Sequence, residues 1–179
     1  IESAWLTGGG SDNTIDARDF SSGPVTLDGA AGNDTLLGGS GDDRLIGSDG
    51  IDQVQQQSDA DQVLTDSLLT GAGSDEIDGI EEAQLSGGSG DNLLDATAFN
   101  NGPVTLSGLD GNDTLRGSAG DDSLAGGDGL DLVEQTIDAD QTWSSTPCLG
   151  VRNGIQTVQG NANGDVQCQT NLAQNLAVR

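Results

Sequence analysis

Aliphatic side chains recur along this chain with a usual step of nine residues, and polar, glycine-rich stretches separate them. They lie at Leu6, Ile15, Leu27, Leu36, Leu45, Val54 and Leu64, and a second series at Leu85, Leu94, Leu106, Leu115, Leu124 and Val133 ends at Trp143. A nine-residue unit is too short and too rich in glycine for a helix, whereas it fits one short strand and one tight turn. Two units would make a coil of 18 residues, with strands alternating between two parallel sheets and the aliphatic side chains between them. The pattern therefore predicts an all-β fold, a parallel β-roll or β-solenoid.

This periodicity is nested inside a longer repeat. Residues 80–143 restate residues 1–64 at an offset of 79, with 37 of the 64 aligned positions identical. We therefore expect two tandem 79-residue cassettes, the first at residues 1–79 and the second at 80–143, followed by a divergent C-terminal cap or tail at 144–179. One strand per aliphatic position gives about eight half-coils per copy. Because eight is even, both copies should present the same face.

The nonapeptide pattern is interrupted between the copies. The stretch Gln53–Gln62 contains five glutamines, which is compatible with a low-complexity linker. Its alignment with the second copy through Asp-Ala-Asp-Gln favours ordered structure instead.

Composition argues against an ordinary globular core and brings in a cation. The 179 residues include two Phe, two Trp and no Tyr or Met. Thirty acidic residues face five arginines, which gives a formal net charge of −25. Low hydrophobicity with such a charge is typical of disorder, so the chain is either disordered or neutralised by positive ions within its fold. The charge disfavours nucleic acid as a partner, and without a run of about 18 apolar residues no membrane insertion is expected.

The glycine-rich turns place oxygen ligands at a spacing that suits Ca²⁺. Three consecutive nonapeptides in each copy, residues 29–55 and 108–134, have glycine at the first and fourth places, aspartate at the sixth and an aliphatic residue at the eighth. Ca²⁺ takes six to eight oxygen ligands from carboxylates and backbone carbonyls, and glycine lets a turn aim its carbonyls inward. One turn cannot complete such a shell, so we expect ions between turns stacked 18 residues apart.

This stacking predicts four pairs of aspartates. They are Asp34 with Asp52 and Asp113 with Asp131 on one edge of the roll, and Asp43 with Asp61 and Asp122 with Asp140 on the other edge. Asp61 and Asp140 lie in degenerate turns without glycine, so their two sites should be weaker.

The expected carbonyl ligands lie in the same turns, at Gly29, Ala31, Gly38, Ser40, Ser48, Gly50, Gly108, Asp110, Gly117, Ala119, Gly127 and Gly129. Asp75 ends a further turn, Thr-Gly-Ala-Gly-Ser-Asp, and is a candidate ligand without an evident stacking partner. Asn13 and Asn92 hold the sixth place in two other turns. Those turns should bind calcium poorly unless Asp12 or Asp91 substitutes, because an amide oxygen is neutral.

The pattern Gly-Gly-x-Gly-x-Asp plus an aliphatic residue resembles the RTX, or haemolysin-type calcium-binding, nonapeptide repeat. Good copies and their flanks cover most of residues 1–143. The resemblance implies a calcium-folded β-roll in an exported bacterial protein, usually one that leaves by type I secretion. The segment Ile-Glu-x-Ala-x-Leu before the repeats also resembles cassettes of long bacterial surface and filament proteins. We therefore expect an extracellular or cell-surface location.

Together these features predict a calcium-binding structural module that folds and becomes rigid on binding Ca²⁺ outside the cell. Assembly into a homo-oligomer, or head to tail into a surface layer or filament, is a further expectation, because the end of an open solenoid is a bare strand edge. The alternative is a non-catalytic secretion or folding domain of a larger exported enzyme or toxin. A flexible acidic linker, or a solenoid whose aspartates only form turns, fits less well with the regular aliphatics and the carboxylate repulsion.

No catalytic function is expected, because a chain without histidine has neither an H-E-x-x-H zinc site nor a Ser-His-Asp triad. In the tail, Cys148 and Cys168 could form a disulfide in an oxidising compartment or pack as small buried side chains. A cap, an export signal and an assembly interface are all open as roles for the tail.

Overall fold

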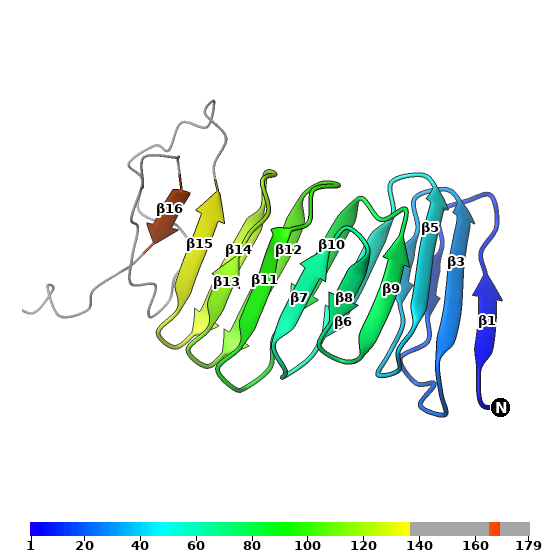
Figure 1. Cartoon of the computed structure of the whole chain (residues 1–179), viewed down its shortest axis with the longest axis horizontal. Helices are drawn as coiled ribbons and strands as arrows, with labels where there is room; N and C mark the ends of the chain where they lie inside the picture. Colours follow the sequence, from blue (N-terminus) through cyan, green and yellow to red (C-terminus); the bar gives the residue numbers. More distant parts are fainter. Residues whose placement is uncertain (137–164, 169–179) are drawn as a thin grey trace, which may run out of the picture.

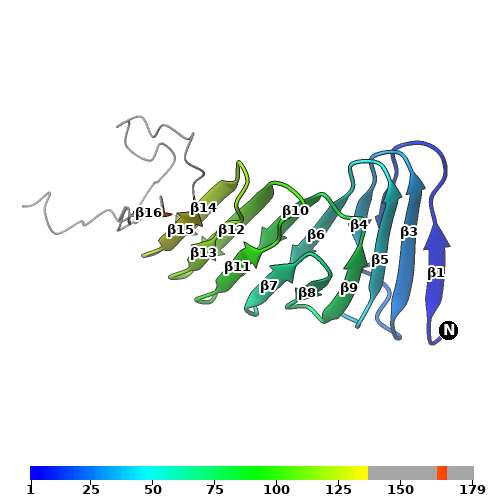
Figure 2. The same ribbon diagram turned by 45° about the horizontal axis from the view of Figure 1, so that its top comes forward.

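The computed structural model describes residues 1–136 and the strand Asp165–Cys168, and the described residues form strands without any helix. The strands are β1 (Ala4–Thr7), β2 (Thr14–Asp16), β3 (Val25–Ala31), β4 (Thr35–Leu37), β5 (Arg44–Asp49), β6 (Gln53–Gln57), β7 (Gln62–Thr65), β8 (Leu68–Thr70), β9 (Ser74–Asp78), β10 (Glu82–Ser86), β11 (Leu93–Ala98), β12 (Val104–Asp110), β13 (Thr114–Arg116), β14 (Ser123–Asp128), β15 (Leu132–Thr136) and β16 (Asp165–Cys168). Figures 1 and 2 show them as two layers that face each other along a row of coils. Among these residues there is no long apolar helix of the kind that crosses a bilayer.

One sheet contains ten strands in the order β1-β3-β5-β9-β8-β7-β11-β13-β15-β16, and the other contains six in the order β14-β12-β10-β6-β4-β2. Apart from β7, β8 and β9, and from β16, which pairs antiparallel with β15 in the same sheet, consecutive strands alternate between the sheets. Each of these coils pairs in parallel with the coil before it. The step is 18 residues in the nonapeptides, where Leu27 lies opposite Leu45, and 21 residues in the flanking coil, where Leu6 lies opposite Leu27. The predicted all-β parallel β-solenoid is confirmed.

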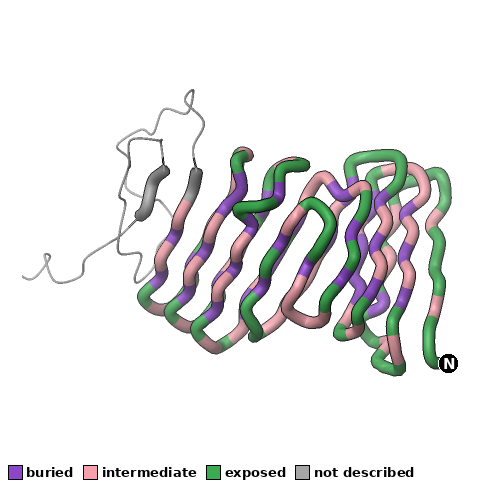
Figure 3. Tube along the Cα trace, viewed as in Figure 1, coloured by how far each residue is buried: buried purple, intermediate pink, exposed green. Residues whose placement is uncertain are grey.

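The core is a narrow row of aliphatic side chains between the two sheets. Figure 3 shows buried and less buried positions alternating along the strands, as expected where successive side chains point to opposite faces. Most of the periodic aliphatic residues are fully or almost fully buried, with Leu27, Leu36 and Val54 at 0 % exposure and Leu45 at 1 %, whereas Leu124 is partly buried. Burial of each such side chain contributes roughly 2 kcal/mol. Each coil therefore needs an aliphatic residue at this place, which explains the regular step in the sequence.

Residues 58–81 depart from the coil pattern and form a meander. Strands β7, β8 and β9 lie side by side in the ten-stranded sheet, and both contacts are antiparallel, with Leu64 opposite Leu69 and Leu69 opposite Asp75. At its two ends the meander pairs in parallel, β9 with β5 and β7 with β11. In the other sheet β6 pairs directly with β10. The glutamine-rich stretch is therefore ordered, as its alignment predicts, and one sheet gains two strands that the other lacks.

The meander places equivalent strands of the two sequence copies in opposite sheets. Strands β1 to β6 make six passages, and the meander makes a seventh before β10 begins. As a result β1 and β3 lie in the ten-stranded sheet, whereas their sequence equivalents β10 and β12 lie in the six-stranded sheet. The predicted even number of half-coils is wrong. It assumed one crossing between the sheets for each aliphatic position, whereas β7, β8 and β9 lie side by side in one sheet.

Several predictions fall outside the described residues. These are the placement of Asp140 and Trp143, the Cys148–Cys168 disulfide and the role of the 144–179 tail. They stay predictions, as does the boundary between the two cassettes.

Candidate metal sites along the two edges

The nonapeptide turns reverse the chain at the two edges of the roll. In four of the six turns the second and fourth places have positive φ, with Ala30 at 76° and Gly32 at 118° in one turn, and Leu109 at 76° and Gly111 at 121° in its equivalent. This left-handed region favours glycine. A Cβ on Gly32 would also meet the carbonyl carbon of Ser11 at 2.5 Å. At Gly32, Gly50, Gly111 and Gly129 the stacked turns are thus too close for a side chain at the fourth place.

The sixth-place aspartates form ladders between stacked turns. The backbone amide of Asp34 donates to Oδ1 of Asp52 at 2.7 Å, and that of Asp113 donates to Oδ1 of Asp131 at 2.9 Å. All four residues are buried, with exposed fractions of 2 % or less. The structure therefore brings together two of the four pairs that the 18-residue spacing predicts.

Each ladder leaves carboxylate oxygens inside the protein without a partner. Among the described residues, five buried side-chain oxygens accept no hydrogen bond, and all belong to sixth-place aspartates: Oδ2 of Asp34, Asp43, Asp52, Asp113 and Asp131. An unpaired buried carboxylate costs several kcal/mol. A structure that repeats this arrangement five times calls for a positive partner at each oxygen.

The first-place glycines show where such a partner fits. A Cβ on Gly47 would lie 2.6 Å from Oδ2 of Asp52 and closer still to the carbonyl oxygen of Gly79. A Cβ on Gly29 would lie 2.8 Å from the carbonyl oxygen of Gly47 and beside Oδ2 of Asp34. At both positions a carboxylate oxygen and a carbonyl oxygen of the next coil lie within 3 Å of the point where a Cβ would be, so glycine lets the two oxygens come close to each other.

This donor set suits a hard cation. Ca²⁺ binds carboxylate and backbone carbonyl oxygens in shells of flexible geometry. Among the described residues no three His, Cys, Asp or Glu side chains come together as a metal cluster, so a site here would take most of its ligands from the backbone. The orphaned Oδ2 atoms and the glycine-lined space therefore fit calcium at the turns.

The two predicted ladders lie on opposite edges, which corrects the expectation that they share one. Asp34 and Asp52 follow strands β3 and β5 of the ten-stranded sheet, at the upper edge in Figure 1, where the chain leaves that sheet. Asp113 and Asp131 follow strands β12 and β14 of the six-stranded sheet, and so lie at the lower edge, where the chain enters the ten-stranded sheet. The odd number of passages causes this exchange.

Asp43 pairs with Asp75 and not with Asp61. The Asp43 amide donates to Oδ1 of Asp75 at 2.9 Å, and the two residues are 4 % and 2 % exposed. Asp61 instead accepts the Leu93 amide at 2.9 Å. The predicted Asp43–Asp61 pair is wrong because β9, and not β7, lies next to β5. The same contact gives Asp75 the partner that the sequence did not reveal.

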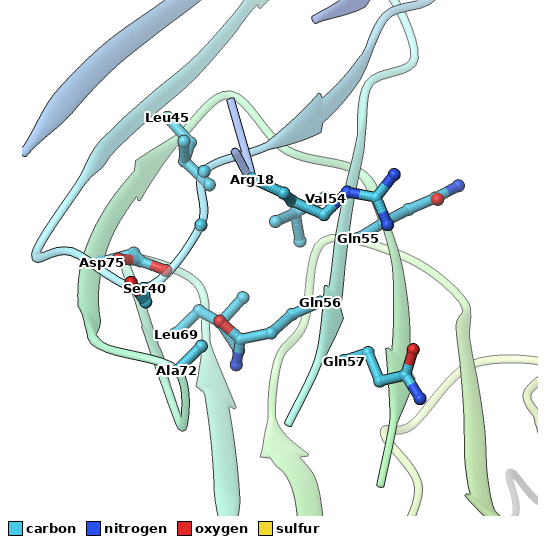
Figure 4. Close-up of a pocket in the computed structure, with 12 residues that line it drawn as sticks. Arg18, Ser40, Leu45, Val54, Gln55, Gln56, Gln57, Leu69, Ala72 and Asp75 are labelled. Carbon is cyan, nitrogen blue, oxygen red and sulfur yellow. The ribbon is translucent and has the colours of Figure 1, made fainter. Parts of the chain in front are cut away.

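A cavity of about 200 Å³ lies beside the Asp43–Asp75 pair. Figure 4 shows Leu45, Val54 and Leu69 at its apolar side, with Asp75 and Gln56 among its polar lining. Gly38, Gly39 and Ser40 of the turn before Asp43 also line it. The cavity is found where the meander adds strands to one sheet only.

Asp122 differs from the other sixth-place aspartates. Its carboxylate accepts bonds from the Ser118 hydroxyl at 2.9 and 3.1 Å and from the Val104 amide at 2.8 Å. Ser118 replaces the second-place glycine of the pattern. The predicted partner, Asp140, lies outside the described residues, so this site stays a prediction.

The two asparagine turns are satisfied internally. Oδ1 of Asn13 accepts the Gly9 amide and Oδ1 of Asn92 accepts the Gly88 amide, both at 2.8 Å. Asp12 and Asp91 bind the amides of the asparagines that follow in the next coil, Asn33 and Asn112, both at 2.8 Å. Weak calcium binding at these turns stays a prediction.

Burial shifts the acidity of the ladder carboxylates. It raises the pKa of Asp52, Asp113 and Asp131, and neighbouring carboxylates act in the same direction. For Asp75, burial raises the pKa from 3.8 to about 7, although the bond from the Asp43 amide opposes this change. These groups would lose their protons on binding a cation, so metal affinity should fall with falling pH.

The residues expected to supply carbonyl ligands all lie at the edges, in the turns or in the last residues of the strands that precede them: Gly29, Ala31, Gly38, Ser40, Ser48, Gly50, Gly108, Asp110, Gly117, Ala119, Gly127 and Gly129. In five of the six nonapeptide turns, a Cβ on the first-place glycine would lie within 2.6 Å of Oδ2 of the aspartate in the same turn. Metal binding by individual carbonyls stays a prediction.

Glu81 is a further ladder residue that the nonapeptide pattern does not predict. The Asp52 amide donates to Oε2 of Glu81 at 2.9 Å, so this glutamate occupies the next rung of the ladder. A signal was present, because residues 78–81 read Asp-Gly-Ile-Glu and residues 49–52 read Asp-Gly-Ile-Asp.

Comparison with known families agrees with this geometry. A model of the RTX calcium-binding nonapeptide repeat matches in four copies, over residues 26–54, 84–101 and 105–133. No curated protein is similar enough in sequence to count as a relative. The first and third ranges contain the two predicted ladders, Asp34–Asp52 and Asp113–Asp131. Between residues 26 and 133, the chain therefore belongs to the RTX calcium-binding nonapeptide-repeat family, whose repeats are typical of secreted bacterial proteins.

Proposed function

We propose that this chain is a calcium-binding structural module of a secreted or cell-surface bacterial protein, which folds and becomes rigid when it binds Ca²⁺ outside the cell. The observation that supports the proposal is the five buried carboxylate oxygens that lack a partner among the described residues. They belong to calcium-binding repeats, in a chain with a net charge of −25. The proposal gives the module no catalytic role.

The chain's own residues explain why folding would depend on the ion. Ca²⁺, when bound, supplies positive charge and up to eight positions for oxygen ligands. The sixth-place aspartates would hold it together with carbonyls of the adjacent coil. Otherwise the buried carboxylates repel one another at low dielectric, and 29 glycines favour the unfolded chain through their entropy.

The expected energies are large enough for a folding switch. A site held at ten times its dissociation constant adds about 1.4 kcal/mol to stability, so five sites would add about 7 kcal/mol. That sum is comparable to the whole stability of a typical domain, about 5–15 kcal/mol. Extracellular calcium modules bind at roughly 10⁻⁴–10⁻³ M. The chain would therefore stay largely unfolded at low intracellular calcium and fold at millimolar calcium outside.

Far-ultraviolet circular dichroism tests the switch directly. The chain in chelator should show a disordered spectrum, and millimolar Ca²⁺ should convert it to a β-rich spectrum. Mg²⁺ at the same concentration is the control, since it demands stricter octahedral geometry and should restore much less structure. A β-rich spectrum in chelator would contradict the proposal.

We also infer that the first coil is a surface for head-to-tail self-assembly. Leu6 holds an inward core position on β1 but is 42 % exposed, whereas its sequence equivalent Leu85 is fully buried because β6 lies beside β10. Trp5, on the other face of β1, is 72 % exposed. Among the described strands β1 pairs with β3 alone, and such an edge strand with exposed apolar side chains is a template for pairing with another chain.

Light scattering after size-exclusion chromatography tests this assembly. In saturating Ca²⁺ the chain should form species larger than the monomer, and Leu6→Gln should weaken their formation. Ile51→Gln is a matched control, because Ile51 is a 55 % exposed turn residue away from that strand. A monomer at every concentration in calcium would refute self-assembly and leave the calcium switch standing.

A further inference from the structure

The segment between the two sequence copies ends in a rung that lies outside the nonapeptides. Residues 55–83 fall between two ranges matched by the repeat family. Near their end, residues 78–81 (Asp-Gly-Ile-Glu) repeat the order of residues 49–52 (Asp-Gly-Ile-Asp), with glutamate in place of the last aspartate. The structure stacks these two segments, so that Glu81 lies next to Asp52 across 29 residues of sequence.

The contacts of Glu81 reproduce those of a ladder aspartate. The Asp52 amide donates to Oε2 of Glu81 at 2.9 Å, as the Asp34 amide donates to Oδ1 of Asp52 at 2.7 Å. In return the amides of Glu81 and Glu82 donate to the carbonyl oxygen of Asp52 at 3.0 and 2.9 Å. The longer side chain of glutamate thus reaches the position that aspartate holds one coil earlier.

A second observation points to a ligand at this rung. Asp52 is fully buried, and its Oδ2 has no partner among the described residues. This oxygen and the carbonyl oxygen of Gly79 converge on the space beside Gly47 where a Cβ would otherwise lie. Gly79 has a φ of 64°, in the left-handed region, as do the turn glycines of the nonapeptides.

We propose that Asp52, Glu81 and the carbonyl of Gly79 form a calcium site that joins the first sequence copy to the second. This junction site rests on the proposed calcium-dependent function and extends it to a segment that the repeat pattern does not describe. Two carboxylates and a carbonyl oxygen give it the same donor chemistry as the nonapeptide sites.

The junction site would couple the folding of the two copies. Asp52 precedes β6, the strand of the last nonapeptide in the first copy, and Glu81 precedes β10, the first strand of the second. One ion bound by both Asp52 and Glu81 would hold β6 and β10 in register. It would also hold together the two ends of the segment that contains the meander. The ordered meander would then depend on the ion as well as on its own hydrogen bonds.

Glu81→Gln is the variant that tests the junction site, because it removes one ligand charge and keeps an oxygen that can accept the Asp52 amide. Glu82→Gln is the matched control. It removes the same charge one residue later. The side chain of Glu82 lies on the face of β10 opposite that of its buried neighbour Ala83. Native mass spectrometry in calcium counts the bound ions, and hydrogen exchange reports the Asp52 and Asp34 amides.

The expected result is one ion fewer in Glu81→Gln than in the wild type and in Glu82→Gln, because loss of a ligand charge weakens a calcium site by about tenfold or more. Exchange of the Asp52 amide should accelerate by a similar factor, while the Asp34 amide stays protected. Equal ion counts and equal exchange in the two variants would overturn the junction site alone. A wild-type chain that binds no calcium would overturn the proposed function itself.

Anomalous diffraction from calcium-soaked wild-type crystals decides the matter if Glu81→Gln does not fold. A calcium peak between Asp52 and Glu81 would support the junction site. Peaks at the nonapeptide turns with none at this rung would overturn it.

Discussion

At the residue scale, five of the buried sixth-place aspartates are bound through one carboxylate oxygen and left unpartnered, among the described residues, at the other. Oδ1 of Asp52 accepts the Asp34 amide, whereas Oδ2 of Asp52 has no partner among the described residues. Asp122 holds the same place in its nonapeptide, yet Ser118 donates to both of its oxygens. Aspartates at one position of the repeat should therefore differ in how much they need a cation.

Asp34→Asn tests this difference. The change removes a charge whose second oxygen is orphaned, so more calcium should be needed for folding. We expect the free energy of unfolding at saturating calcium to fall by about 1–3 kcal/mol. Calcium titration followed by circular dichroism gives the midpoint, and urea unfolding gives the free energy. Asp122→Asn is the comparison and should have a smaller effect. Equal effects of the two substitutions would contradict the argument.

The raised pKa values predict how the calcium-free chain responds to pH. Burial raises the pKa of Asp75 from 3.8 to about 7, and it raises those of Asp52, Asp113 and Asp131 as well. A carboxyl group whose pKa is raised by folding binds more protons in the folded state, so stability increases as pH falls. The stability that comes from protonation of Asp75 increases as pH falls from about 7 to 3.8, and below 3.8 this increase is complete.

In calcium-free buffer, β-sheet content should therefore rise as pH is lowered from 7 towards 4, and Asp75→Asn should flatten part of this rise. Circular dichroism against pH provides the measurement. Asp16 does not interfere, because the hydrogen bond from Arg18 lowers its pKa to about 2 and its window lies below 3.8. A loss of structure between pH 7 and 4 would argue against buried ladder carboxylates.

At the scale of the elements, the meander combines buried aliphatic side chains, Leu64, Leu69 and Ile77, with a network of side-chain amides. Gln62 is fully buried, and its Nε2 donates to the carbonyl oxygens of Ser86 at 2.6 Å and Ser58 at 3.3 Å. Its Oε1 accepts Nε2 of Gln56 at 3.1 Å, and the same Nε2 donates to the Thr70 carbonyl at 3.0 Å. This network joins β6, β7, β8 and the end of β10.

Gln62→Leu should destabilise the chain although leucine is apolar and similar in size. It removes the three hydrogen bonds of the Gln62 side-chain amide, to the Ser86 and Ser58 carbonyls and from Gln56, which costs about 1–3 kcal/mol in total. Gln57→Leu, at an exposed position of β6, should change stability by no more than about 0.5 kcal/mol. Urea unfolding in saturating calcium compares them, and equal losses would show that the buried network contributes little.

At the scale of the whole molecule, shape and charge both follow from the solenoid. The coils lie in one row (Figure 2), so most contacts join neighbouring coils and the core is narrow. Twenty-nine of the 30 acidic residues lie before residue 144, and their repulsion opposes this compact form. Calcium binding should therefore change the dimensions of the molecule as well as its secondary structure.

Small-angle X-ray scattering measures that change. An unfolded chain of 179 residues has a radius of gyration of about 45 Å, and a compact globule of that length has about 16 Å. We expect the value in chelator to approach the first figure. In calcium it should fall well below that figure and stay above the second, because a solenoid is elongated. Equal radii in chelator and in calcium would contradict a folding switch.

Much of the regular roll was predictable, because it depends on a fixed step in the sequence. The aliphatic period placed Leu27, Leu36 and Leu45 in the core, and the 18-residue spacing identified the Asp34–Asp52 and Asp113–Asp131 pairs. Asp43–Asp75 and Asp52–Glu81 were not identified, because their steps of 32 and 29 residues fit no period.

The sequence by itself determined the local unit of this protein: a strand, a glycine turn with positive φ, and an aspartate that stacks on the next coil. These features depend on residues within one or two coils, so a nine-residue pattern is sufficient to specify them. Only the tertiary structure decided that residues 58–81 turn back within one sheet, which exchanges the edges of the second copy and brings Glu81 to Asp52. Whether a chain crosses to the facing sheet or reverses as a hairpin depends on pairing with distant strands, here β9 with β5 and β7 with β11. A local pattern does not contain that information.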